Sequence, residues 1–225
     1  MSAWGPLALL LSGPPATDWP TIASLATALG TLVLAIATFA AVRSSNRSAR
    51  LAEVALEEQR RPVLVQSRLD DPLQKIMFLG GHWVRVAGSG GIAEHLDGIV
   101  YLAMSLRNVG AGIGVLQGWV ARRGLQTSTV DHATEEEFRH QTRDLYIPPG
   151  DVGLWQGAFR DPSDDAHGEI ARAAEERDTI SIELLYTDQV GGQRTISRFQ
   201  LVPVGDDGWL TASGRHWYLD HEGPR

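Results

Sequence analysis

An unbroken apolar stretch near the N-terminus is the strongest pattern in the chain. Residues 22–42 contain no charged side chain and no polar side chain beyond Ser and Thr. At about 1.5 Å per residue, a helix of this length covers roughly 30 Å, the thickness of the hydrocarbon core of a bilayer. The pattern predicts a transmembrane helix over residues 20–42, preceded by a short N-terminal tail at 1–19.

The residues after the predicted span keep a helical composition. Residues 43–61 hold no Gly or Pro, and Pro62 ends the segment. Glu57 and Arg61 are spaced as a favourable i,i+4 ion pair. We therefore expect the membrane helix to continue through 43–61 as a juxtamembrane stalk.

From Pro62 onward the pattern changes to short alternating runs separated by Gly-rich turns. The runs at 99–107 and 179–187 place apolar side chains at every second position, as half-buried strands do. Without the strand–helix alternation of a parallel sheet, the fold class is mainly β, an Ig-like antiparallel β-sandwich with one short helix. The sandwich is expected to occupy 62–221, with the helix at 169–176 and a loop at 89–91. Further strands are expected at 63–68, 75–79, 83–87, 115–122, 152–160, 193–204 and 209–219.

Small residues repeat along one face of the predicted membrane helix. Ala23, Gly30 and Ala37 are spaced by seven residues and therefore share a face. Such a stripe allows close packing between helices and would make the protein a homo-oligomer. The alternative is that small residues are simply common in spans of this kind.

Charge predicts the orientation and restricts the partners. No Lys or Arg precedes the span, while Arg43, Arg47 and Arg50 follow it, so the positive-inside rule places the N-terminus outside and the rest in the cytoplasm. Residues 62–225 carry fifteen basic against twenty-three acidic side chains, which makes nucleic acid an unfavourable partner. Cysteine is absent, and Lys75 is the only lysine, a composition typical of a GC-rich bacterial source.

Motifs that could carry chemistry fail on spacing. Gly112 and Gly114 begin a pattern that would need a third glycine at Gln117, and they join two strands instead of opening a helix. The glycines at 110–114 are instead expected to allow positive φ or a bulge, with Asn108 as a turn former that uses its amide on nearby backbone. Residues 161–169 have some oxygen ligands of a calcium loop but carry Ala166 where that loop needs glycine. We therefore expect no catalytic residue, no metal and no cofactor. An enzyme with a dispersed site remains an alternative.

The tryptophans offer one candidate binding surface. Trp119, Trp155 and Trp217 lie in three different predicted strands. Large aromatic rings usually fill the core of a sandwich, but on an exposed face they would form a groove for a peptide or a sugar. Both alternatives remain open from the sequence.

Three segments together carry a resemblance to a known group of proteins. They are EEQRRPVLV (57–65), LRNVGAGIG (106–114) and RHWYLD (215–220). The chain resembles an uncharacterised, actinobacterial-type family of single-pass membrane proteins with a C-terminal β-sandwich. The resemblance implies the architecture and no activity.

These observations predict a membrane-anchored interaction or scaffold protein. It would be a single-pass protein of the bacterial cell membrane, presenting an acidic β-sandwich to protein partners on the cytoplasmic face. The alternative is an envelope-facing sandwich that binds a peptide or a sugar.

Overall fold

The computed structural model describes residues 18–128 and 130–220, and the chain forms two compact units that meet between Val54 and Ala55. The first unit is helical. The second contains the last turn of that helix and all of the strands. The predicted tail at 1–19 lies outside the described residues, except for its last two.

Helix α1 runs without interruption from Trp19 to Glu58. None of its side chains is buried, and it is long and apolar enough to cross a membrane. The predicted continuity of span and stalk is confirmed. The helix ends three residues before the predicted end at 61, because Arg60 and Arg61 donate to carbonyls only three residues back and the chain then turns away.

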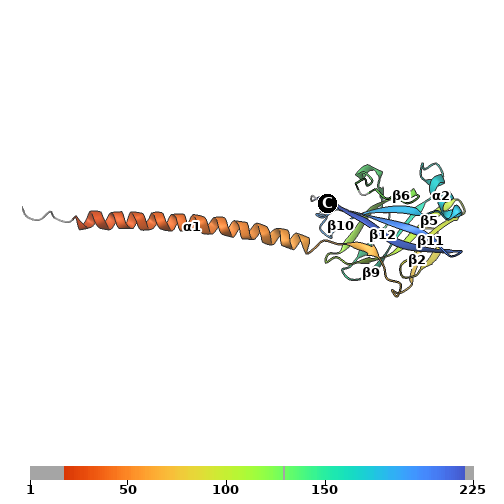
Figure 1. The fold of residues 1–225 in the computed structure, drawn as a ribbon, viewed down its shortest axis with the longest axis horizontal. Helices are drawn as coiled ribbons and strands as arrows, with labels where there is room; N and C mark the ends of the chain where they lie inside the picture. The colour runs from red at the N-terminus through yellow and green to blue at the C-terminus, as the bar shows by residue number, and fades with distance from the viewer. Residues whose placement is uncertain (1–17, 129, 221–225) are drawn as a thin grey trace, which may run out of the picture. The chain divides into compact units, whose positions relative to one another are not determined.

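The strands of the second unit agree with most of the predicted runs (Figure 1). They are β1 Leu64–Gln66, β2 Gln74–Met77, β3 Trp83–Val86, β4 Gly90–Leu96, β5 Ile99–Asn108, β6 Gly114–Arg123, β7 Arg139–His140, β8 Tyr146–Ile147, β9 Val152–Phe159, β10 Ile180–Thr187, β11 Thr195–Val204 and β12 Gly208–Tyr218. A 3-10 turn covers Glu135–Glu137, and helix α2 covers His167–Glu176.

Ten of these strands form one antiparallel sheet within the described residues. Its order is β9-β5-β4-β12-β11-β10-β6-β7, with β1 beside β5 and β8 beside β6. Although β6 and β9 lie near opposite ends of this order, the rings of Trp119 and Trp155 meet edge to face at 5.4 Å. The antiparallel, strand-rich fold is confirmed. Its sandwich-like packing comes from a single sheet that curls onto itself, and not from two separate sheets.

One hydrophobic core fills the space inside the curled sheet. Side chains from β1, β4, β5, β6 and β8 to β12 all enter it, including Leu102, Phe199 and Trp155, which are fully buried. Helix α2 packs its apolar face, centred on Ile170, against the same core. A second, smaller cluster lies on the outer face of β5, where the β2–β3 hairpin covers Tyr101 and Ala103.

Strand β4 corrects a prediction, because residues 89–91 were expected to form a loop and no strand was expected between them and residue 99. In the structure β4 joins β5 to β12 and so holds the two halves of the sheet together. A Cβ at Gly91 would lie 2.2 Å from the Leu201 side chain, which favours glycine there despite its poor strand propensity. Glu94 and His95 are consecutive polar residues, so they also interrupt the alternation of apolar and polar side chains expected of a strand.

Candidate functional site

The turn after β5 holds the segment through which the chain enters the β domain. The buried side chain of Asn108 accepts the N–H groups of Gly110 at 3.0 Å and Val63 at 3.2 Å. Its amide nitrogen donates to the carbonyls of Gly112 at 2.6 Å and Ile147 at 2.9 Å. The predicted use of this amide on nearby backbone is confirmed. We call residues 108–112 the clasp.

Glycine is needed in the clasp for close approach between two stretches of backbone. A Cβ at Gly112 would lie 1.6 Å from the carbonyl oxygen of Arg60, and one at Gly110 would lie 2.3 Å from that of Arg61. The sequence predicted positive φ or a bulge here. The positive-φ alternative is wrong, because neither glycine is among those with positive φ.

The last turn of α1 is also tied to the β domain. The Arg61 side chain is buried, donates to Glu58 at 2.6 Å, and lies 4.2 Å from the centre of the Tyr218 ring. Gln193 donates to the main-chain carbonyl of Glu57. The structural domain therefore begins inside the segment that the sequence assigned to the stalk.

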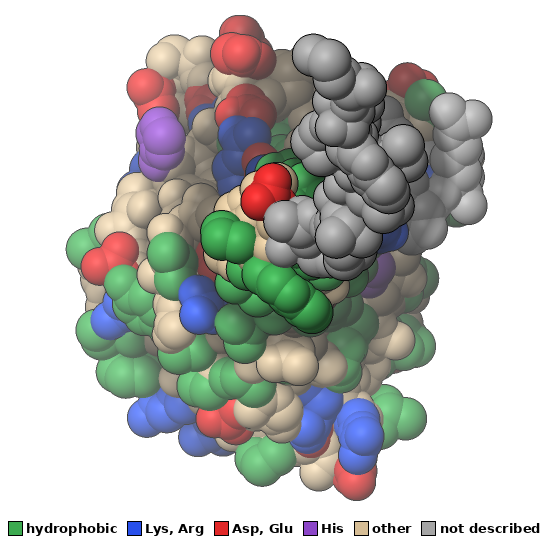
Figure 2. Space-filling model, turned by 90° about the vertical axis from the view of Figure 1, so that its left-hand side faces the viewer, with side chains coloured by type: hydrophobic (Ala, Val, Ile, Leu, Met, Phe, Trp, Pro, Cys, Tyr) green, Lys and Arg blue, Asp and Glu red, His purple; other side chains and the backbone are tan. Residues whose placement is uncertain are grey.

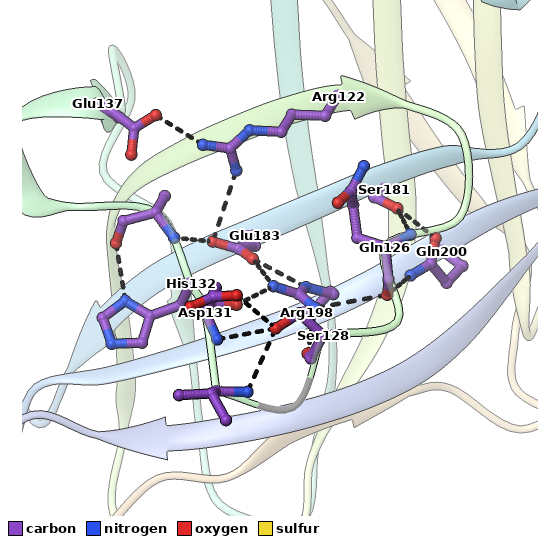
Figure 3. A network of polar contacts seen from close by, with 12 residues as sticks. Arg122, Gln126, Ser128, Asp131, His132, Glu137, Ser181, Glu183, Arg198 and Gln200 are labelled. Carbon is purple, nitrogen blue, oxygen red and sulfur yellow. Dashed lines mark hydrogen bonds and ion pairs between the residues drawn. The ribbon is translucent and has the colours of Figure 1, made fainter.

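A buried ion pair on the outer face of β10 and β11 anchors the loop between β6 and β7 (Figure 3). Arg198 donates to Glu183 Oε1 at 2.6 and 2.8 Å, and to the carbonyls of Ser128 at 2.7 Å and Asp131 at 2.6 Å. Glu183 Oε2 accepts the N–H of Ala133 at 2.6 Å. Both charged groups are saturated by these bonds, so the network fixes a loop and leaves no free group for chemistry.

A second polar chain lies inside the sheet and contains the only Ser–His pair found in the described residues. The Tyr186 hydroxyl accepts the Leu64 N–H at 3.2 Å and lies 2.8 Å from Ser197 Oγ. Ser197 Oγ lies 2.5 Å from His216 Nδ1. Burial raises the pKa of Tyr186 to about 12 and lowers the pKa of His216. Ser197 has no exposed surface, so a substrate cannot reach it as a nucleophile.

Two of the three candidate tryptophans are core residues. Trp119 is 5% exposed and Trp155 is fully buried, which corresponds to the core alternative for these two rings. Trp217 is half-buried and lies apart from them, in a cluster with Val120, Phe138 and Ile196. The three rings therefore do not share one exposed platform.

The sheet is not closed between its two ends. Strand β9 at one end faces residues 139–143 at the other, and a cleft of about 360 Å³ lies between them. A smaller cleft of about 210 Å³ adjoins it and shares Phe78, Leu79, Thr142 and Gln156 with it. The Gln141 side chain bridges the gap by donating to the Gln156 carbonyl at 3.0 Å. We call this gap, between residues 154–160 and 139–143, the seam.

The floor of the seam is built from a neutralised cation and aromatic rings. Arg139 forms a two-pronged ion pair with Asp164 and lies 4.6 Å from the Phe159 ring and 5.7 Å from the Trp119 ring. The charge of Arg139 is therefore balanced within the protein by Asp164, and we assign this ion pair a structural role. The sequence did not predict the seam, because nothing in the local pattern indicated that residues 139–143 lie opposite β9.

The acidic loop at 161–169 has partners that explain it without calcium. Asp161 accepts the N–H and O–H of Ser163, and these bonds lower the pKa of Asp161. Within the described residues no three His, Asp or Glu side chains are grouped as a metal site. The face in Figure 2 mixes acidic and basic side chains with neutral ones and has no continuous basic area.

Comparison of the chain with protein-family models, curated proteins and solved structures gives no match.

Proposed function

We propose that the chain is a single-pass membrane protein that presents its β domain to protein partners on the cytoplasmic face. The observation that supports this proposal is the apolar first half of α1, in which no side chain is buried by the protein. Leu25, Leu29, Ile36 and Phe39 are each more than half exposed, a large free-energy cost in water that lipid tails would remove.

The orientation rests on charge. Arg43, Arg47 and Arg50 follow the apolar segment, and none of them has an acidic partner among the described residues. Positive side chains at this boundary are retained on the cytoplasmic side during insertion. The bacterial source and the resemblance to actinobacterial-type anchored proteins remain part of this proposal.

An interaction role is favoured over catalysis by how the polar groups are used. The Ser197–His216 pair is closed to substrate, and the Glu183–Arg198 pair is saturated by structural bonds. The clasp holds the main chain of residues 61–63, where the chain enters the β domain, as a display module on a tether needs.

Self-association of α1 is the second part of the proposal. Ala23, Gly30 and Ala37 lie on one exposed face, and a Cβ added at Gly30 would meet nothing within 4 Å. Ala41 lies one turn after Ala37 on the same face, and the same seven-residue spacing from Ala41 leads to Ser48 and Ala55. Small side chains therefore continue along this face of the helix.

Membrane placement is tested by fractionation and by labelling with cysteine, which the chain lacks. The full chain should sediment with membranes and be released by detergent but not by alkaline carbonate. A Ser2→Cys variant should react with a membrane-impermeant maleimide on intact cells. An Asp206→Cys variant, in an exposed turn, should react only after permeabilisation. The reverse labelling pattern would favour the envelope-facing alternative, and a soluble chain would refute the anchor.

Self-association is tested with a matched pair of variants. Ala37→Leu places bulk on the narrow face, whereas Ala35→Leu makes the same change about 160° around the helix. Ala37→Leu should weaken dimer formation by about tenfold, measured by sedimentation equilibrium in detergent, while Ala35→Leu should not. Equal effects, or a monomeric wild type, would refute pairing through this face.

A further inference from the structure

We propose that the seam binds an extended, carboxylate-bearing peptide segment of a partner protein, which adds a strand to the free edge of β9. The inference rests on the proposed interaction function and names the class of partner. Three independent features of the seam support it: unpaired main-chain groups, buried acceptors without donors, and arginines without carboxylates.

The register shows which main-chain groups of β9 are free. The Asn108 N–H donates to the Asp151 carbonyl, and the Gly150 N–H donates to the Asn108 carbonyl. The main-chain N–H and C=O groups of the even-numbered residues of β5 therefore point toward β9. Leu106, Met104 and Leu102 therefore bond to residues 153, 155 and 157. The N–H and C=O groups of Leu154, Gln156 and Ala158 face the seam.

Of those six groups, only the Gln156 carbonyl has a hydrogen-bond partner among the described residues, and that partner is the Gln141 side chain. Neighbouring strands of a sheet lie about 4.8 Å apart and are joined by main-chain hydrogen bonds. A side-chain bridge in place of a ladder means that the seam is wider than one strand spacing. An edge of this kind is a template for strand addition.

Side-chain acceptors lie in the same place. The Oε1 atoms of Gln141 and Gln156 are buried and have no hydrogen-bond donor within the described residues. A buried unsatisfied acceptor costs about 1–3 kcal/mol, and an incoming peptide N–H would remove that cost. Gln156 lines the cleft, Gln141 lies between the cleft residues His140 and Thr142, and both glutamines are partly exposed.

Charge selects the partner. Arg143 donates to the Met77 carbonyl and Arg160 to the Leu79 carbonyl, but neither has an ion-pair partner in the part of the chain described. Asp161, already bonded to Ser163, is the remaining acid that lines the cleft. Two unpaired arginines in an otherwise acidic domain favour a peptide with carboxylate side chains. A sugar is disfavoured, because Trp119 and Trp155 are buried and offer no stacking surface.

Hydrogen exchange of the free, full-length protein in detergent tests the edge itself. The amides of Gln156 and Ala158 should exchange at least a hundredfold faster than those of Trp155 and Gly157, which bond to β5. Equal protection of the two sets would show that the edge is already paired and would overturn the proposal.

Peptide selection tests the ligand class. A random nonapeptide phage library should be panned against the full-length protein in nanodiscs. Enriched peptides should contain Asp or Glu and lack central proline, and should protect the amides of Gln156 and Ala158. Failure to enrich, or enrichment of neutral or basic peptides, would overturn the proposal.

Matched variants locate the site. Arg143→Glu with Arg160→Glu should weaken binding of the selected peptides by at least tenfold. Arg172→Glu changes an equally unpaired arginine that donates to a carbonyl on α2, and should leave binding unchanged. Equal losses in both proteins would place the site elsewhere. These tests use detergent or nanodiscs, so their failure would leave the membrane placement intact, and a failed fractionation would leave the seam intact.

Discussion

The outer face of β10 and β11 and the seam along β9 both bury polar side chains, but they satisfy them differently. Under the loop at 126–134, both oxygens of Glu183 and the guanidinium of Arg198 are fully bonded. In the seam, two glutamine side chains are half-buried with their amide oxygens unpaired. The first region closes the fold onto itself, and the second leaves hydrogen-bonding capacity unused.

The contrast gives a physical criterion for separating structure from function in this chain. Polar groups retained for folding recover their desolvation cost within the protein. Groups that remain buried and unpaired lower stability, and a ligand that pairs them regains that energy. The variants below test whether the two regions differ in this way.

The largest effect is expected from breaking the buried ion pair. Glu183→Ala would leave the Arg198 charge and the Ala133 N–H unpaired in the interior. The free energy of unfolding should fall by about 3–5 kcal/mol. Urea titration of the full chain in detergent, followed by tryptophan fluorescence, measures the change.

A paired replacement serves as its control. Glu183→Leu combined with Arg198→Met removes both charges together and should cost less than Glu183→Ala alone. A loss below 1 kcal/mol for Glu183→Ala would contradict the assignment of this network as structural.

A smaller but clear effect is expected in the clasp. Gly112→Ala would push a methyl group against the Arg60 carbonyl, which is backbone and cannot rotate away. We expect a loss of roughly 1–3 kcal/mol in unfolding free energy by the same titration. Gly192→Ala is the control, because a Cβ there meets nothing and the backbone has no positive φ. Equal effects of the two changes would rule out close packing at residue 112.

A pH effect follows from His216. Its pKa is lowered by burial, so the unfolded chain binds a proton more readily than the folded one. The contribution of this histidine is complete above its unfolded pKa of about 6.5 and is lost as the pH falls below that value. Between pH 7.5 and 5.5, wild type should therefore lose more thermal stability than His216→Gln, as followed by circular dichroism. An equal loss would show that His216 keeps an ordinary pKa.

The sequence predicted elements whose side-chain pattern is local. The apolar span in α1 and the alternation in β5 and β10 are of this kind, and each appears nearly as expected. Strand β4 was missed because Gly91, which weakens the strand pattern, packs against Leu201, a residue more than a hundred positions away. No local pattern encodes such a contact.

The seam could not be predicted for a related reason. It exists because β9 and residues 139–143 lie at opposite ends of one curled sheet, and the sequence suggested two separate sheets. Gln141 and Gln156 carry no signal by themselves, since most glutamines lie at the surface. The clasp was partly visible, because Asn108 followed by alternating glycines indicated a tight turn.

The smallest effect on stability is expected in the seam, at Gln141. Gln141→Leu removes one hydrogen bond to Gln156 but also removes a buried acceptor that has no donor. These two changes oppose each other, so the free energy of unfolding should shift by less than about 1 kcal/mol. Binding of the selected acidic peptides should nevertheless weaken severalfold, because one acceptor for the added strand is lost. A loss of stability comparable to that of Glu183→Ala, with peptide binding unchanged, would instead make the Gln141 bridge a structural closure of the sheet.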